Sequence, residues 1–167
     1  MFFKIIKEDC KAYKIKLSLI SILKNYFVSS SFKAVVIFRI SQYFYSKNLK
    51  FFAVIFKQKN IKRNSCEIGF QARIGNGMVI RHPMGIVISG DCQIGSNVII
   101  SQNVTIGNKN GESCCIGDNC DIGSWAIILG NVKIGNNVKI GANAVVLNDV
   151  EDNSIVVGIP AKPIRNR

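Results

Sequence analysis

Aliphatic residues recur at every sixth position over nearly half of the chain. The series comprises Ile68, Ile74, Ile80 and Ile86, then, after a two-residue offset, Ile94, Ile100 and Ile106, then, after a longer interruption, Ile116, Ile122, Ile128, Ile134, Ile140 and Val146. A period of six fits neither an α-helix, with its period of about 3.6, nor a lone amphipathic strand, with its period of 2. It is typical of a hexapeptide-repeat parallel β-helix, in which each repeat forms one short strand and a corner. The pattern therefore predicts a mainly β solenoid.

The position two residues before the repeated aliphatic is usually small or β-branched. It holds Cys66, Ala72, Cys92, Val98, Val104, Cys114, Cys120, Ala126, Val132, Val138 and Ala144. Four of the six cysteines therefore occupy a packing position, where a free thiol behaves as a small apolar group. The chain has no CxxC pair, and one histidine cannot complete the usual zinc sets. We expect reduced cysteines, no metal and a cytoplasmic protein.

Breaks in the period divide the chain into three parts. Residues 1–63 precede the repeats and predict short helices, with apolar residues at helical spacing at Val36, Ile40 and Tyr43. Residues 64–150 form the solenoid, which extrudes residues 107–115 as a loop, and the coil stack is expected to end near Val146. Residues 151–167 close the solenoid and lead into a basic tail, as expected of an atypical terminal unit.

The net charge of +12 belongs entirely to the helical segment. Residues 1–63 carry 14 Lys and Arg against Glu8 and Asp9, whereas residues 64–167 carry eight of each sign. The segment either caps the open end of the solenoid and packs between subunits, or docks on anionic lipid through its basic residues. No uncharged run approaches the roughly 18 residues that span a membrane, and Lys4, Lys7 and Lys11 interrupt any signal-peptide core. No motif that reads nucleic acid is present.

Several segments together resemble a known family. "EIGFQARIGNGMVIRHPMGIVI", "IGDNCDIGSWAIILGNVKIGNNVKIGANAVV" and "VVGIPAKPI" are similar to the serine acetyltransferase branch of the left-handed β-helix acyltransferases, and most similar to its short members that O-acetylate bacterial surface polysaccharides. The resemblance implies a left-handed parallel β-helix, acetyl-CoA as the acetyl donor, and a homotrimer with active sites between subunits.

The resemblance also assigns the only histidine. His82 matches the family's general base, and Glu67, fifteen positions earlier, stands where an acidic residue orients that base. A hydroxyl that attacks a thioester must lose its proton, and imidazole titrates near neutral pH. A carboxylate fixes the imidazole tautomer. The alternatives are that His82 is an ordinary corner residue and Glu67 a solvated one, because fifteen residues are three short of a full eighteen-residue coil.

Two departures from the family pattern bear on the acceptor. Arg81 replaces the aspartate that precedes the histidine in serine acetyltransferases, and Ser113 replaces a second histidine in the loop. We therefore expect the acceptor to be a sugar hydroxyl of a surface polysaccharide or of a nucleotide-sugar precursor. Serine O-acetylation, for cysteine synthesis, and a catalytically silent structural β-helix are the alternatives. Arg81 binds an acidic sugar or pairs with a neighbouring subunit's carboxylate.

The remaining assignments follow the same resemblance. Trp125 stands beside the cofactor track, where it either stacks on the cofactor or acceptor or packs at a subunit contact. The coenzyme A positions are, for the backbone along the pantetheine arm, Gly107, Asn108, Ser124 and Ala142, and, for the phosphates, Lys162 or Arg165.

Overall fold

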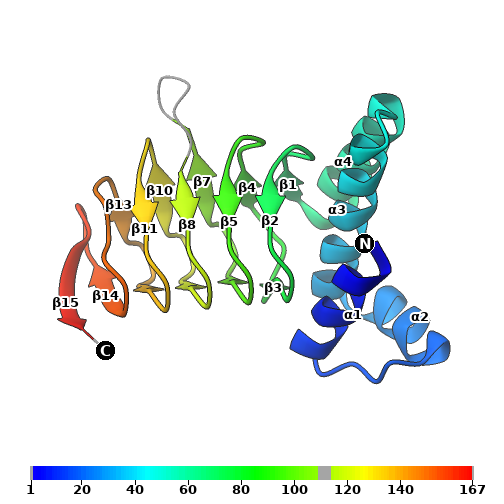
Figure 1. Ribbon diagram of the computed structural model, residues 1–167, viewed down its shortest axis with the longest axis horizontal. Helices are drawn as coiled ribbons and strands as arrows, with labels where there is room; N and C mark the ends of the chain where they lie inside the picture. Colours follow the sequence, from blue (N-terminus) through cyan, green and yellow to red (C-terminus); the bar gives the residue numbers. More distant parts are fainter. Residues whose placement is uncertain (1, 109–113, 167) are drawn as a thin grey trace.

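The computed structural model describes residues 2–108 and 114–166 and shows a solenoid of short strands with helices packed at one end (Figure 1). The helices are α1 (Phe2–Ala12), α2 (Leu19–Val28), α3 (Ser30–Ser46) and α4 (Lys50–Asn64). The last helix leads directly into the first strand. The predicted mainly β fold with a helical N-terminal segment is confirmed.

Three parallel sheets form the faces of the solenoid. Face A contains β1 (Cys66–Ile68), β4 (Ile86–Ile88), β7 (Thr105–Gly107), β10 (Ile127–Leu129) and β13 (Val145–Val146). Face B contains β2 (Arg73–Ile74), β5 (Gln93–Ile94), β8 (Cys115–Ile116) and β11 (Lys133–Ile134). Face C contains β3 (Val79–Ile80), β6 (Ile99–Ile100), β9 (Asp121–Ile122), β12 (Lys139–Ile140), β14 (Ser154–Val157) and β15 (Lys162–Asn166). From β1 to β14, consecutive strands fall on different faces, and the strands of each face pair in parallel, as a hexapeptide β-helix requires.

The repeated aliphatic positions fill the interior, with one change of register. Ile68 pairs with Ile88, whereas Ile86 pairs with Cys66. The interior repeat position on β4 is therefore Ile88, and the two extra residues lie before Ile86, in the corner Arg81–Gly85, rather than after it. The cysteines predicted to pack inside, Cys66, Cys92, Cys114 and Cys120, are all buried.

The solenoid continues beyond Val146, where its end was expected. Strand β14 pairs in parallel with β12, so it completes the third face of a further coil. Strand β15 then folds back and pairs antiparallel with β14. The chain thus ends with a strand of opposite direction against the last coil, and a stack of parallel strands cannot propagate past it.

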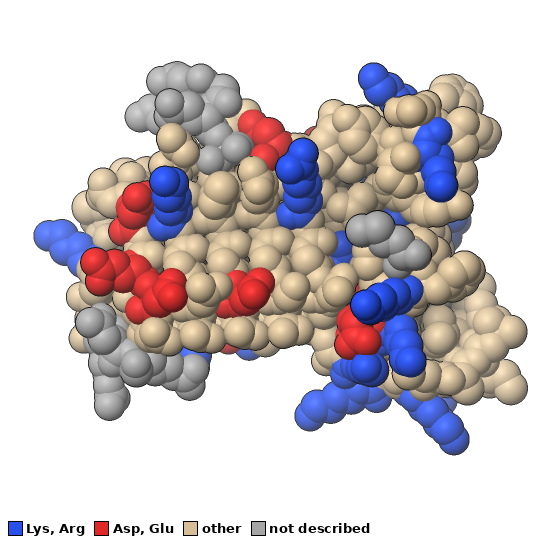
Figure 2. All heavy atoms as spheres, in the orientation of Figure 1, with Lys and Arg blue, Asp and Glu red and all other residues tan. Residues whose placement is uncertain are grey.

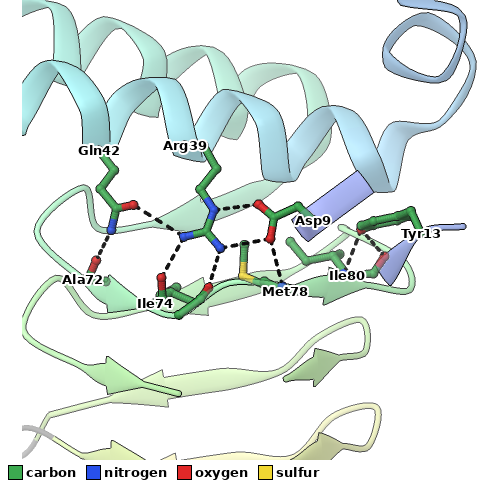
Figure 3. Close-up of polar contacts among 9 residues, drawn as sticks. Asp9, Tyr13, Arg39, Gln42, Ala72, Ile74, Met78 and Ile80 are labelled. Atoms are coloured by element: carbon green, nitrogen blue, oxygen red, sulfur yellow. Dashed lines mark hydrogen bonds and ion pairs between the residues drawn. The ribbon is translucent and has the colours of Figure 1, made fainter. Parts of the chain in front are cut away.

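The helices cover the first coil, whose backbone groups have no preceding coil to pair with (Figure 3). A buried ion pair lies at the centre of this contact: Arg39 Nε of α3 donates to Asp9 Oδ2 of α1 at 2.8 Å. Arg39 also donates to the carbonyl oxygens of Ile74 at 2.8 Å and Gly75 at 2.6 Å, and Asp9 accepts from the Met78 amide at 3.0 Å. Both charges are therefore compensated. The same two side chains provide hydrogen-bond partners for backbone groups at the open end of the solenoid.

Polar side chains on either side of this ion pair extend the same arrangement. The Tyr13 hydroxyl accepts from the Ile80 amide at 2.8 Å and donates to its carbonyl oxygen at 3.0 Å. Gln42 donates to the carbonyl oxygen of Ala72 at 2.8 Å. Burial raises the pKa of Tyr13, so its hydroxyl stays protonated and keeps both hydrogen bonds.

Over residues 2–108 and 114–166, no helix is both long and apolar enough to cross a membrane.

Candidate active site

His82 lies in the corner between face C and face A of the first coil. Hydrogen bonds fix the backbone on either side of it. The Arg81 amide donates to the carbonyl oxygen of Ile100, and the Ser31 hydroxyl donates to the Arg81 carbonyl oxygen at 2.6 Å. The Gly85 amide donates to the carbonyl oxygen of Ser65 at 2.9 Å. Pro83 is buried, whereas the His82 side chain is exposed. The corner therefore holds the imidazole outside the coil, on an anchored backbone.

Three other predicted positions lie in the same corner of later coils. Ser124 and Trp125 follow β9, and Ala142 follows β12, so each occupies the turn from face C to face A. Backbone amides join these turns along the solenoid by donating to carbonyl oxygens of the preceding turn. The pairs are Asn103 to Met84 at 2.9 Å, Trp125 to Gln102 at 3.0 Å and Asn143 to Ser124 at 2.9 Å. The structure thus brings His82, Trp125, Ser124 and Ala142 into one column.

Trp125 has an unusual backbone for its residue type. Its φ is 64°, whereas the residues at the same place in the adjacent coils are Asn103 and Asn143, with φ of 57° and 59°. Asparagine tolerates this left-handed conformation, and a bulky residue does so rarely. The indole is 58 % exposed, so no burial in this chain compensates for the strain. A strained, exposed aromatic residue beside the His82 column marks a candidate binding position.

Glu67 lies apart from this column, on the outer side of face A. Its carboxylate forms an ion pair with Lys57 of α4 at 2.8 Å. The two side chains border a pocket of about 390 Å³ that also includes Gly107 and Asn108, at the base of the predicted loop. Within the described residues, neither Glu67 nor His82 donates or accepts a side-chain hydrogen bond with the other. Their pairing stays a prediction.

The loop base is fixed by an acidic side chain that the sequence analysis did not single out. Asp91 accepts from Asn108 Nδ2 at 2.8 Å and from the Ser89 hydroxyl at 2.5 Å. These two hydrogen bonds lower the pKa of Asp91, the one from Ser89 most, because they stabilise the ionised carboxylate. Asn108 therefore leaves the coil from a defined position.

Arg81 is occupied within its own chain. Its guanidinium donates to both carboxylate oxygens of Asp121, at 3.0 Å each, and to the Ser101 hydroxyl at 3.3 Å. This bidentate contact ties the His82 corner to β9, two coils further along face C. The expected partners of Arg81 were an acidic sugar or a neighbouring subunit's carboxylate, and both stay predictions. Within its own chain, the guanidinium pairs with Asp121, which neither expectation included. Aligning the outward positions Val79, Ile99 and Asp121 by coil would have revealed this partner.

The other predicted residues lie further away. Lys162 is exposed on β15, and Arg165 belongs to the same strand, at the end of the solenoid opposite the helices (Figure 1). Ser113 lies outside the described residues. A larger groove of about 1320 Å³ runs along face B beneath α1, and none of the predicted site residues that the structure describes borders it. Among residues 2–108 and 114–166, no three His, Cys, Asp or Glu side chains are grouped as metal ligands.

Comparisons with known proteins place the chain in a family. Residues 113–148 match the model of the bacterial transferase hexapeptide (six repeats). Serine acetyltransferase of Bacillus pumilus is 38 % identical over 172 residues, which cover 98 % of this chain and 78 % of that protein. Serine acetyltransferase of Staphylococcus aureus is 48 % identical over 103 residues, 59 % of this chain. The chain spans only about half of the staphylococcal relative, with 48 % covered.

Solved structures give the same result. The serine acetyltransferase of Neisseria gonorrhoeae superposes with a TM-score of 0.88 and 32 % identity, covering 99 % of this chain and 66 % of that one. The soybean serine acetyltransferase complexed with serine gives a TM-score of 0.87 and 29 % identity, covering 98 % of this chain and 69 % of that one. The likeness therefore includes the helices as well as the repeats.

The expectation of a polysaccharide acceptor is wrong. The relatives and the superposed structures are serine acetyltransferases, which supports the alternative reading. The expectation rested on Arg81 and Ser113, which stand where serine acetyltransferases have an aspartate and a second histidine. These two replacements do not outweigh the similarity of the rest of the chain. The similarity to the Bacillus pumilus protein extends over nearly the whole chain and most of that relative. The chain is an acyltransferase and belongs to the serine acetyltransferase family of hexapeptide-repeat proteins.

Proposed function

We propose that this protein transfers the acetyl group of acetyl-CoA to the hydroxyl of L-serine. The observation that carries the proposal is the 38 % identity to a serine acetyltransferase over 98 % of the chain. The exposed imidazole of His82, on an anchored corner, supplies the base that this reaction requires.

In the proposed reaction, the His82 imidazole accepts the proton of the serine hydroxyl while the serine oxygen bonds to the thioester carbonyl carbon. The carbon–sulfur bond then breaks, and the departing sulfur takes the proton back from the imidazolium. Because the same base removes and returns the proton, one histidine is sufficient. Glu67 is proposed to hold the imidazole tautomer, once its carboxylate exchanges Lys57 for His82.

A homotrimer is proposed because one chain separates the two halves of the predicted cofactor site. Trp125, Ser124 and Ala142 share the His82 column, whereas Gly107 and Asn108 lie beside the face A pocket. Between them, the outward side chains of face A form a largely apolar stripe in register, comprising Val87, Thr105, Ile127 and Val145. A stripe of this kind is expected to be covered by another subunit. The groove between subunits would then combine one subunit's His82 column with its neighbour's loop base.

Product identification tests the proposed acceptor. The protein is incubated with acetyl-CoA and L-serine, and the products are analysed by mass spectrometry. The proposal predicts O-acetyl-L-serine and free coenzyme A in equal amounts, and no acetylated product when O-methylserine replaces serine, because its oxygen has no proton to lose. Thioester hydrolysis to acetate with unmodified serine would contradict it.

Asp121 is predicted to act as a positioning residue through Arg81. Replacing Asp121 with Asn removes the carboxylate that holds the guanidinium and loosens the corner on which His82 stands. We expect kcat to fall by about tenfold with an unchanged KM for acetyl-CoA, since misplacing a catalytic group costs rate rather than ground-state binding.

The matched control for that substitution is Glu151→Gln, which removes an exposed carboxylate far from the corner. It is expected to leave kcat unchanged. Because the Arg81 and Asp121 side chains are partly exposed, the free energy of unfolding of Asp121→Asn should be close to that of the wild type. Wild-type kcat in Asp121→Asn would show that the Arg81 contact has no role in the reaction.

A further inference from the structure

Helix α2 is packed unlike the other three helices. None of its residues is buried, and its exposed apolar side chains are Leu19 at 73 %, Ile20 at 82 %, Leu23 at 48 %, Phe27 at 71 % and Val28 at 78 %. Leu19, Leu23 and Phe27 follow one another at four-residue spacing, and Ile20 and Val28 lie in the adjacent row with Lys24 between them. These rows form one continuous side of the helix. A single exposed leucine needs no explanation, whereas a contiguous apolar helix face does.

This face belongs to a strongly positive part of the molecule. The segment that contains it has fourteen Lys and Arg and only two acidic residues, Glu8 and Asp9. Asp9 is paired with Arg39 inside the protein, and Glu8 is paired with Lys11. Both acidic charges are therefore already compensated. Figure 2 shows Lys and Arg side chains gathered around the helical end, with acidic side chains mainly over the solenoid.

The α2 surface combines the apolar rows with basic side chains. It comprises Leu19, Ile20, Leu23, Phe27 and Val28, together with the exposed Lys16 and Lys24. In Figure 1, α2 lies on the side of the helices away from the solenoid, so a flat partner can reach it without meeting the repeats. No residue of the candidate site belongs to this surface.

We propose that the α2 surface docks on an anionic lipid bilayer. A helix with an apolar side and basic flanks lies in the membrane interface, with its apolar side chains among the acyl chains and its lysines at the headgroups. A two-fold contact with a second copy of the chain would bring like charges together, because Lys16 and Lys24 would face their own equivalents. A nucleic acid would match the charge and leave the apolar rows uncovered. Anionic lipid satisfies both features of the surface, and α2 adds no membrane span.

The experiment measures cosedimentation of the full chain with vesicles. Vesicles of phosphatidylcholine mixed with phosphatidylglycerol are compared with vesicles of phosphatidylcholine alone. The test variant is Ile20→Gln/Phe27→Gln. The matched control is Ile159→Gln/Ile164→Gln, which replaces two similarly exposed isoleucines at the opposite end of the molecule, at 74 % and 65 %. Serine acetylation without vesicles is measured for the wild type and the test variant.

The proposal predicts binding to the anionic vesicles only, and weaker binding at higher salt because screening reduces the attraction of the lysines. Removing two large apolar side chains should weaken binding by at least about tenfold, and the control pair should bind as the wild type does. Acetylation by Ile20→Gln/Phe27→Gln should be unchanged. Absence of wild-type binding to anionic vesicles, or equal binding to neutral ones, would overturn the proposal. A smaller oligomer of the test variant in light scattering would also overturn it, because the surface would then join copies of the chain.

Discussion

Replacing His82 with alanine is expected to lower kcat by roughly 10² to 10⁴, the usual contribution of a general base. The affinity for acetyl-CoA should remain close to that of the wild type, because the proposed cofactor contacts come from other residues of the corner column and from the loop base. The His82 side chain is exposed and makes no hydrogen bond within the described residues, so unfolding should be unaffected. Initial rates with serine and calorimetric titration with coenzyme A give the two quantities.

The matched control for His82 is Met84→Ala, which truncates another exposed side chain of the same corner. It is expected to retain most of the activity. Glu67→Gln should have a smaller effect than His82→Ala, because Glu67 is proposed only to orient the imidazole. A His82→Ala variant with wild-type turnover would show that this histidine is a corner residue without a catalytic role.

Asp9→Asn is expected to lower the free energy of unfolding by about 3–5 kcal/mol, the usual consequence of leaving one member of a buried ion pair without its partner. The Arg39 guanidinium is 1 % exposed and would keep its charge beside a neutral amide. The loss should appear in urea unfolding monitored by circular dichroism, at a fixed protein concentration so that association contributes equally.

Two further variants separate the ion pair from ordinary packing effects. Glu8→Gln removes the neighbouring carboxylate, which pairs with Lys11 at the surface, and is expected to change stability little. Asp9→Leu combined with Arg39→Met removes both charges and should cost less than Asp9→Asn alone, because no unpaired charge remains. If Asp9→Asn were no less stable than Glu8→Gln, the capping role of the pair would be refuted.

The repeats were predictable because each coil imposes the same demand on the sequence. An interior position every six residues must be aliphatic, and the position two before it is usually small or β-branched, so the period survives in one sequence without further information. The register of β4 was not predictable from the period alone. Ile86 and Ile88 are both isoleucines two residues apart, and only pairing with Cys66 and Ile68 distinguishes them.

The polar contacts between the helices and the first coil could not be predicted from the sequence, for a different reason. Asp9 and Arg39 are thirty positions apart on separate helices, and Arg39 is one of fourteen basic residues in its segment. Their pairing depends on how α1 and α3 pack on the first coil, which no local pattern specifies. The candidate histidine was found because it is unique and matches the family's general base, whereas Asp121 was missed because its partner is forty residues away.

The acceptor was mispredicted because two positions, Arg81 and Ser113, were given more weight than the rest of the chain. Arg81 and Ser113 indicated the loss of the groups that hold serine, and the structure pairs Arg81 with Asp121 on face C. The position of a residue in a motif does not determine where its side chain points. Similarity over the whole chain carries more information about the acceptor than a single substitution beside the base.

Release of the coenzyme A thiol from acetyl-CoA, followed as the L-serine concentration is raised, tests serine O-acetylation itself. The release is expected to depend on serine and to saturate, with kcat on the order of 10 per second, as is typical of enzymes. Release that is slow and independent of serine, at concentrations where acetyl-CoA is bound, would contradict it.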